Sequence, residues 1–186
     1  NIKPFPRLDP MEEELQTEVV LKVGDNVSTD EIMPAGNRVL PYRSNIPAIS
    51  GFVFDVIDDT FPERAEAAGS GAVVAGHNYG QGSSREHAAL APRYLGVRVK
   101  IAKSFARIHK ANLVNFGILP LVFEDERDYE KVTRGARLSF PGLRRRVESG
   151  ATQIAVESDG VGFTTRLEVS PRQREMLLAG GALNTV

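Results

Sequence analysis

Residues 72–123 read AVVAGHNYGQGSSREHAALAPRYLGVRVKIAKSFARIHKANLVNFGILPLVF, and short apolar runs alternate here with longer amphipathic segments. Short apolar runs are typical of buried strands, whereas apolar residues at near-3.6 spacing are typical of helices. The predicted order is strand, helix, strand, helix, strand, over residues 72–76, 83–96, 97–102, 104–117 and 118–123. This order favours neighbouring parallel strands joined by right-handed crossovers, and thus an α/β fold.

The segments that precede this unit are less regular. The run VVLKV predicts a strand over residues 19–23, and FVFDVI predicts another over residues 52–57. Between them, residues 28–50 form a loop-rich stretch, and loops of that length in a compact domain are more often functional than idle. Pro62 then begins a predicted helix that ends at Gly69.

After Asp125 the sequence changes character. Short β-favouring segments separated by glycine turns cover residues 136–140, 144–149, 152–158 and 162–168. They predict an additional short-stranded layer, antiparallel or barrel-like. We interpret the run Arg144–Arg146 as a solvated edge strand, with a phosphate-binding patch as the alternative. A last helix is expected from Pro171 to Gly180–Gly181.

Composition restricts the class of protein. The chain has 186 residues, 23 Lys plus Arg, 24 Asp plus Glu, three histidines and no cysteine. A net charge of −1 gives no electrostatic case for binding nucleic acid or a membrane surface. A cysteine-ligated zinc or iron–sulfur site within this chain is excluded. No membrane-spanning run or signal peptide is recognisable, so we expect a location in the cytoplasm or in the mitochondrial matrix.

The length predicts one main domain with a short appendage. Residues 1–18 contain Pro4, Pro6 and Pro10 and are expected to form a linker-like N-terminal segment, with the domain itself over residues 19–186. Because the first residue is Asn1 rather than Met, we expect that the chain was cut from a larger polypeptide, with an ordinary frayed terminus as the alternative.

The segment GHNYGQGSSREHAAL, residues 76–90, follows a predicted parallel strand, where α/β sheets bind their ligands. Gly80 and Gly82 allow a tight turn, and we expect Ser83 and Ser84 at a helix N-terminus, where free N–H groups favour anions. Arg85 adds a forked donor for a carboxylate. This pattern predicts an anion site, although a glycine turn followed by serine caps without any function stays open as an alternative.

A serine hydrolase is a weaker interpretation of the same segment. His87 could reach Ser83 because it lies four residues further along the chain. However, no carboxylate is placed to orient His87, and the pattern is not the Gly-x-Ser-x-Gly elbow.

Four segments together resemble a known family. NYGQGSSREHAALAPRYLG and IAKSFARIHKANLVNFGILPL resemble the C-terminal swivelling domain of aconitases. GDNVSTDEIMPAG, residues 24–36, resembles the opening motif of that domain, and AGGALN, residues 179–184, resembles its closing motif. The resemblance spans roughly residues 19–184. It implies a three-layer β/β/α swivelling domain.

The resemblance also implies roles for individual residues. Ser83 matches the catalytic base, which removes a proton from the carbon next to a substrate carboxylate. Ser84 and Arg85 match carboxylate-binding residues, and Arg43 matches an arginine that binds another carboxylate. Asp30 matches an active-site aspartate. His77, His87 and His109 match no catalytic role, and we expect them to be hydrogen-bonded structural residues.

The implied reaction interconverts citrate and isocitrate through cis-aconitate, with a [4Fe–4S] cluster held by three cysteines as the Lewis acid. Since this chain has no cysteine, the cluster would lie in other domains of the same polypeptide or in a large subunit. The isolated chain would then be inactive.

Two other functions stay open. One is the small subunit of an isopropylmalate or homoaconitate isomerase; the loop over residues 37–47 would discriminate, since Arg43 suits a third carboxylate and an apolar group suits an isopropyl tail. The other, more remote, is an RNA-binding module, against which the near-neutral charge argues.

Overall fold

A closed barrel organises the structure, a computed structural model that describes residues 2–186. The order of strands around the barrel is β1-β2-β3-β4-β7-β6-β5. The strands are β1 (Leu15–Lys22), β2 (Gly71–Ala75), β3 (Val97–Ala102), β4 (Leu119–Phe123), β5 (Arg137–Phe140), β6 (Gln153–Ser158) and β7 (Val161–Arg166). Strands β1 to β4 pair in parallel, and the remaining pairs are antiparallel. The predicted parallel core with an added short-stranded layer is therefore confirmed.

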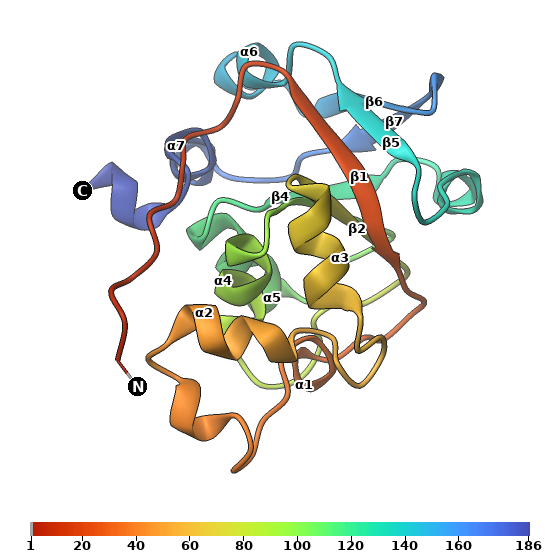
Figure 1. Cartoon of the computed structure of the whole chain (residues 1–186). Coiled ribbons are helices and arrows are strands. Elements are labelled where there is room, and N and C mark those ends of the chain that lie inside the picture. The colour runs from red at the N-terminus through yellow and green to blue at the C-terminus, as the bar shows by residue number, and fades with distance from the viewer. Residues whose placement is uncertain (1) are drawn as a thin grey trace.

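Helices form the third layer, against the parallel half of the barrel (Figure 1). The α-helices are α1 (Thr29–Ile32), α2 (Ile46–Ile49), α3 (Phe61–Ala68), α4 (His87–Tyr94), α5 (Arg107–Asn115), α6 (Leu143–Glu148) and α7 (Pro171–Ala179). Short 3-10 helices are η1 (Leu40–Tyr42), η2 (Ser50–Phe52), η3 (Glu126–Lys131) and η4 (Ala182–Thr185). Helices α1 to α5 lie on the same side of the parallel strands, which gives the β/β/α order of layers.

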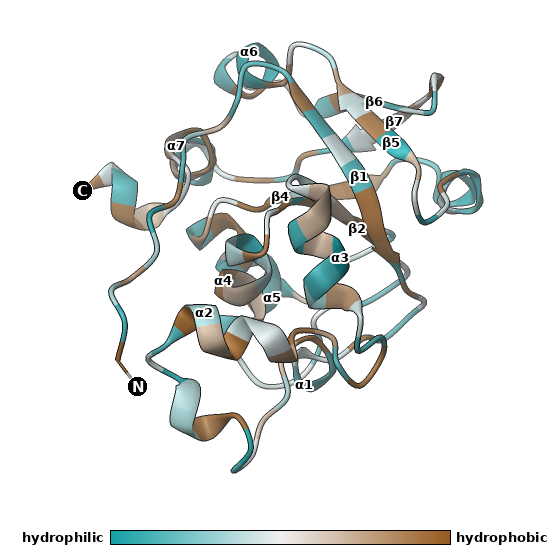
Figure 2. Cartoon of the chain, viewed as in Figure 1, coloured by the Kyte–Doolittle hydropathy of each residue, from teal (hydrophilic) through white to brown (hydrophobic). Residues whose placement is uncertain are grey.

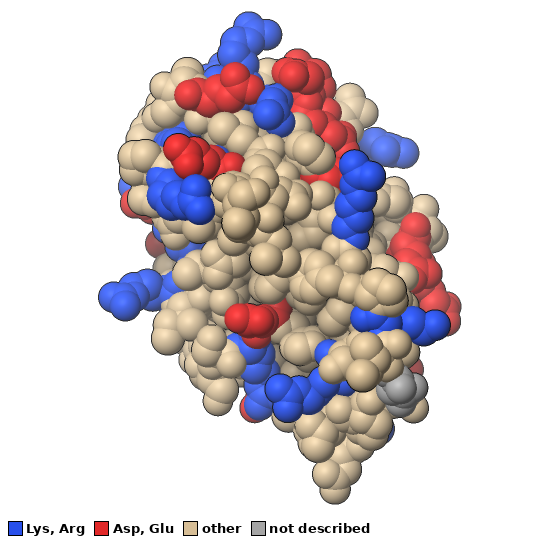
Figure 3. Space-filling view, turned by 90° about the vertical axis from the view of Figure 1, so that its left-hand side faces the viewer, with Lys and Arg blue, Asp and Glu red and all other residues tan. Residues whose placement is uncertain are grey.

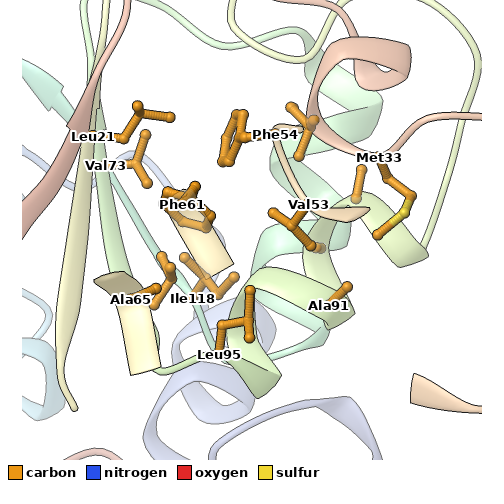
Figure 4. Close-up of a cluster of buried hydrophobic side chains, with 14 of the residues drawn as sticks. Leu21, Met33, Val53, Phe54, Phe61, Ala65, Val73, Ala91, Leu95 and Ile118 are labelled. Atoms are coloured by element: carbon orange, nitrogen blue, oxygen red, sulfur yellow. The ribbon is translucent and has the colours of Figure 1, made fainter. Parts of the chain in front are cut away.

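Two hydrophobic cores follow from the two-residue period of the parallel strands. In β2, Ala72 and Val74 belong to the core inside the barrel, whereas Val73 and Ala75 belong to the core beneath the helices. Figure 4 shows side chains of this second core, from strands, helices and the connection before α3. Because both faces of the parallel strands are buried, these strands are apolar along nearly their whole length.

The predicted strand over residues 52–57 is wrong. The chain there leaves η2 and forms turns, with Phe54 at a positive φ of 57°. Val53 and Phe54 are adjacent and both fully buried, between the helices (Figure 4). An extended strand points neighbouring side chains to opposite faces, so a turn is needed to bury both in the same core.

The interpretation of Arg144–Arg146 as a solvated edge strand is also wrong, whereas the structure does not test the alternative of a phosphate-binding patch. These residues lie in α6, which Figure 2 colours mostly hydrophilic. Leu143 and Val147 are buried at a spacing of four residues, and Arg144 pairs with Glu148 at 2.9 Å. The apolar pair and the ion pair both follow the helical period.

The N-terminal segment packs against the domain. Strand β1 begins at Leu15, so the last residues of the segment expected to be linker-like belong to the barrel. Further upstream, Met11 donates its backbone N–H to Leu178, and the buried Arg93 donates to the carbonyl of Asp9. No helix within residues 2–186 has the length and apolar composition that crossing a membrane requires.

Candidate active site

The two sequence motifs around residues 24–31 and 76–87 lie side by side. Asn26 N–H donates to the His77 carbonyl at 2.8 Å, and Gly80 N–H donates to the Val27 carbonyl at 2.7 Å. These loops follow β1 and β2, which are neighbouring parallel strands, so both leave the barrel at the same end. The fold thereby brings together residues that are about fifty positions apart in the sequence.

Side-chain amides fix the loop after β2 to the loop after β1. Asn78 Nδ2 donates to Gln81 Oε1 at 2.8 Å and to Asn26 Oδ1 at 3.3 Å, and Gln81 Nε2 donates to the Asn26 carbonyl at 3.0 Å. Asn26 and Asn78 both have positive φ, a conformation that asparagine tolerates better than most residues. The sequence analysis missed this network. The Asp-Asn and His-Asn dipeptides after strands were its only local signal.

Gly80 is required by close approach as well as by backbone conformation. Its φ is 88°, and a Cβ atom there would lie 2.3 Å from the ring of His109. The predicted tight glycine turn is therefore packed directly on α5, which gives the following serines a rigid support.

Ser83 and Ser84 lie before the helix and not at its N-terminus, contrary to the expectation. Helix α4 begins at His87 with Glu86 as its N-cap, and Ser83 and Ser84 are in the exposed bend that precedes it. The Ser83 carbonyl accepts the Thr29 hydroxyl at 2.8 Å, which fixes the bend to α1. Without the helix terminus, the helix dipole is not available to these two hydroxyls.

The bend nevertheless offers hydrogen-bond donors. Within residues 2–186, no acceptor takes the backbone N–H groups of residues 82–86 or the Ser83 hydroxyl. The Ser84 hydroxyl accepts a long hydrogen bond of 3.4 Å from Asn112 Nδ2. Unpaired backbone donors at the surface are suited to an anion.

Asp30 and Arg85 form an ion pair. Arg85 Nη2 lies 2.6 Å from Asp30 Oδ1, and the two side chains are 28% and 65% exposed. Asp30 is in the first turn of α1, where Ser28 and Glu31 form a capping box. Asp30 thus orients the Arg85 guanidinium, and Glu31 serves to begin the helix.

Arg43, Ser84 and Arg85 line one cavity of about 480 Å³. Ser83 and Asp30 are outside its lining, although Ser83 adjoins Ser84 and Asp30 contacts Arg85. Throughout the described part of the chain, no group pairs with the Arg43 guanidinium, which is exposed. The rest of the wall includes Glu86 and His87 together with apolar side chains, among them Met33, Val39, Leu40 and Ile49.

The three histidines differ from one another. His77 Nε2 lies 2.7 Å from Glu126, and His87 Nε2 lies 2.7 Å from the Arg43 carbonyl, so both have hydrogen-bond partners. His109 is buried, and neither of its ring nitrogens has a partner in residues 2–186, so the expected hydrogen bond is wrong for this residue.

A buried lysine lies behind the glycine turn. Lys100 is fully buried on the helix-facing side of β3, and its Nζ donates to the Tyr79 hydroxyl. Burial lowers the Lys100 pKa to about 7. Burial, together with the nearby Lys100 charge, lowers the His109 pKa to about 3, so His109 is neutral at physiological pH.

The chain has no cysteine, so it cannot supply cysteine ligands to an iron–sulfur cluster. The groups that the site presents are hydroxyls, N–H donors and guanidinium groups. Groups of these types are suited to binding and orienting an anion.

Fold and site together define an α/β domain with hydroxyl and guanidinium groups gathered at one end of a barrel. Residues 21–126 match the family model described as the aconitase C-terminal domain. The chain belongs to the aconitase family and corresponds to its C-terminal domain.

Similar proteins include a putative mitochondrial aconitate hydratase from Emericella nidulans, 36% identical over 98% of this chain and 26% of that protein. The mitochondrial homocitrate dehydratase of Saccharomyces cerevisiae is 33% identical over 93% of this chain and 26% of its own length. The chain thus spans about a quarter of the length of these relatives. A solved structure titled 3-isopropylmalate dehydratase, from Methanocaldococcus jannaschii, has a TM-score of 0.73 and 29% identity, covering 92% of each chain.

Proposed function

We propose that this chain supplies one part of the active site of an aconitate hydratase, a hydro-lyase that interconverts citrate and isocitrate through cis-aconitate. The observation that supports the proposal is the cavity of about 480 Å³, in which Arg43, Ser84 and Arg85 meet. Guanidinium groups from two separate segments suit a substrate with several carboxylates, because each arginine can bind one carboxylate through paired hydrogen bonds.

In this proposal Arg85 and Ser84 bind one carboxylate, and Arg43 binds another. The Arg85 guanidinium is oriented by Asp30, at 2.6 Å, so its position is set before the substrate arrives. We assign to Asp30 this role in orienting Arg85, in place of a direct part in proton transfer.

Ser83 is the proposed catalytic base. A serine hydroxyl is a weak base and must ionise before it removes a proton from carbon. Since Ser83 is not at a helix terminus, its ionisation depends on the free N–H groups of residues 82–86, on Arg85 and on exclusion of water in the closed enzyme. The Ser83 hydroxyl is exposed and has no partner within residues 2–186, as a group that must reach a substrate requires.

The iron–sulfur cluster of the complete enzyme would be bound outside this chain, either in other domains of one polypeptide or in a large subunit. The cluster would act as the Lewis acid for the substrate hydroxyl. The part of the reaction that falls to this chain is to bind carboxylates and to hold the proton at Ser83 Oγ. The relatives quoted above are named mitochondrial, which favours the mitochondrial matrix over the cytoplasm as the location.

A second candidate is the small subunit of an isopropylmalate or homoaconitate isomerase. Two observations favour it: the similarity in length to the structure from M. jannaschii, and the apolar wall of Met33, Val39, Leu40 and Ile49. The Arg43 guanidinium at the same cavity favours a third carboxylate and thus the first candidate. The net charge of −1 gives no electrostatic support to an RNA-binding module, and on the face in Figure 3 basic and acidic side chains are interspersed.

The test is Ser83→Ala in the complete enzyme, with Ser149→Ala, at the exposed end of α6, as the matched control. Turnover of citrate should fall about 10²–10⁴-fold, the usual contribution of a positioned base, with little change in KM. The same enzyme assayed with 2-isopropylmalate distinguishes the second candidate. Unchanged turnover in Ser83→Ala would remove Ser83 from its role, and a preference for isopropylmalate would replace the first candidate by the second.

A further inference from the structure

Within residues 2–186, one hydrogen bond connects the segment that carries Arg43 to the segment that carries Arg85. His87 is the first residue of α4, immediately after the bend with Ser83 to Glu86, and its Nε2 lies 2.7 Å from the carbonyl oxygen of Arg43. A carbonyl oxygen can only accept, so Nε2 carries the hydrogen. His87 and Arg43 are 44 residues apart in the sequence, and both line the same cavity.

The segment that carries Arg43 is a series of short turns with backbone hydrogen bonds of its own, such as Asn45 N–H to the Tyr42 carbonyl at 2.9 Å, and Lys3 N–H donates to the Ser44 carbonyl at 2.9 Å. Helix η1 has three residues, none of them buried, and the Arg43 N–H bonds to the Leu40 carbonyl at 3.2 Å. Arg43 itself is exposed, as is Ser44 after it. Behind the segment, Tyr42 stacks on Phe52 with ring centroids 5.9 Å apart. In the part of the chain that the structure describes, His87 is the one side chain that hydrogen-bonds to the backbone of Arg43.

We propose that His87 is a positioning residue for substrate binding. It holds the backbone of Arg43 and thereby fixes the separation between the Arg43 guanidinium and the Ser84–Arg85 pair on the adjacent bend. A substrate whose carboxylates match that separation is bound without reorganisation of the loop. His87 thus acts through Arg43 and sets affinity for the additional carboxylate, while Ser83 acts on the proton. This inference rests on the proposed function for its substrate, but the hydrogen bond can be tested independently.

The first experiment measures hydrogen exchange of residues 39–45 in the complete enzyme without substrate. His87→Leu should exchange faster there, and His87→Gln should resemble the wild type, because the glutamine amide can place a donor near the position of Nε2. His77→Leu is the matched control, since His77 makes a contact of equal length, 2.7 Å, but to Glu126 outside the cavity. Unchanged exchange in His87→Leu would overturn the inference, whatever the enzyme's substrate.

The second experiment is steady-state kinetics with citrate on the same variants. His87→Leu should raise KM about tenfold with kcat nearly unchanged, and His87→Gln should restore KM. In an Arg43→Ala background, His87→Leu should have no further effect, because the group that it positions is absent. If His87→Leu raised KM equally in the wild-type and the Arg43→Ala backgrounds, the inference that His87 acts through Arg43 would be overturned. Faster exchange combined with unchanged kinetics would keep the hydrogen bond but refute the proposed use of Arg43 in binding.

Discussion

The buried Lys100 makes the stability of this chain depend on pH in a calculable way. Its pKa is lowered from 10.5 to about 7 by burial, and its Nζ donates to the buried Tyr79 hydroxyl. Between pH 7 and pH 10.5 the unfolded chain binds a proton at Lys100 that the folded chain does not bind. The free energy of unfolding therefore rises with pH across this window and loses this contribution as pH falls toward 7.

The perturbation that isolates this effect is Lys100→Met. Each pH unit inside the window is worth about 1.4 kcal/mol, less near the folded pKa, so from pH 7 to pH 9 the wild type should gain about 2 kcal/mol relative to the variant. Loss of the hydrogen bond to Tyr79 should cost roughly 1–3 kcal/mol. This cost is constant over the range, since burial raises the pKa of Tyr79 well above its ordinary value.

The assay is urea unfolding at pH 7, 8 and 9, followed by circular dichroism, with the exposed Lys3→Met as control. The quantity of interest is the difference in the free energy of unfolding between variant and wild type, because the contributions of the other tyrosines and lysines to the pH dependence cancel in this difference. A difference for Lys100→Met that changes by less than about 0.5 kcal/mol over this range would refute the reasoning, because it would mean that Lys100 is charged in the folded chain.

Two further changes probe the site. Gly80→Ala should lower the free energy of unfolding, measured in urea, by more than about 2 kcal/mol, because it adds a clash with His109 to an unfavourable φ. Gly82→Ala is the control, since Gly82 also has a positive φ but a Cβ atom there would have its nearest contact at 3.5 Å. An equal loss of stability in both variants would contradict the clash. Asp30→Asn should change the free energy of unfolding by less than about 1 kcal/mol, because the ion pair of Asp30 with Arg85 is partly exposed. In the complete enzyme the same variant should raise KM about tenfold. An unchanged KM would contradict the role of Asp30 in orienting Arg85.

The parallel core was predictable because its signal is local. Strands β2 and β4 are apolar runs, β3 combines apolar residues with Arg98 and Lys100, and glycines such as Gly96 and Gly117 end the helical segments between them. The errors arose where tertiary packing selects the conformation. Both FVFDVI and RRRVES favour strands by composition. In the structure, however, Val53 and Phe54 are buried together in a turn, and Leu143 pairs with Val147 across one helical turn.

The site was predictable only in part. Ser83, Ser84 and Arg85 are contiguous, so a local pattern was enough to identify them. Arg43 and Asp30 came from the family resemblance, because no spacing rule connects residues so far apart. The contacts of His87 with Arg43 and of Lys100 with Tyr79 are long-range. A lysine within a strand is also expected at a solvated face, and only the helices that cover β3 bury it.

The position of the site follows from the parallel half of the barrel. The segments that follow β1, β2 and β3 all leave the barrel at the same end. The segment after β3 also supports the site, because Ser104 Oγ accepts a hydrogen bond from the Asn78 N–H at 2.8 Å. Parallel strands therefore give several loops one common support, whereas the antiparallel half returns its connections to alternate ends. None of the candidate site residues comes from β5 to β7, the strands that close the barrel between β4 and β1.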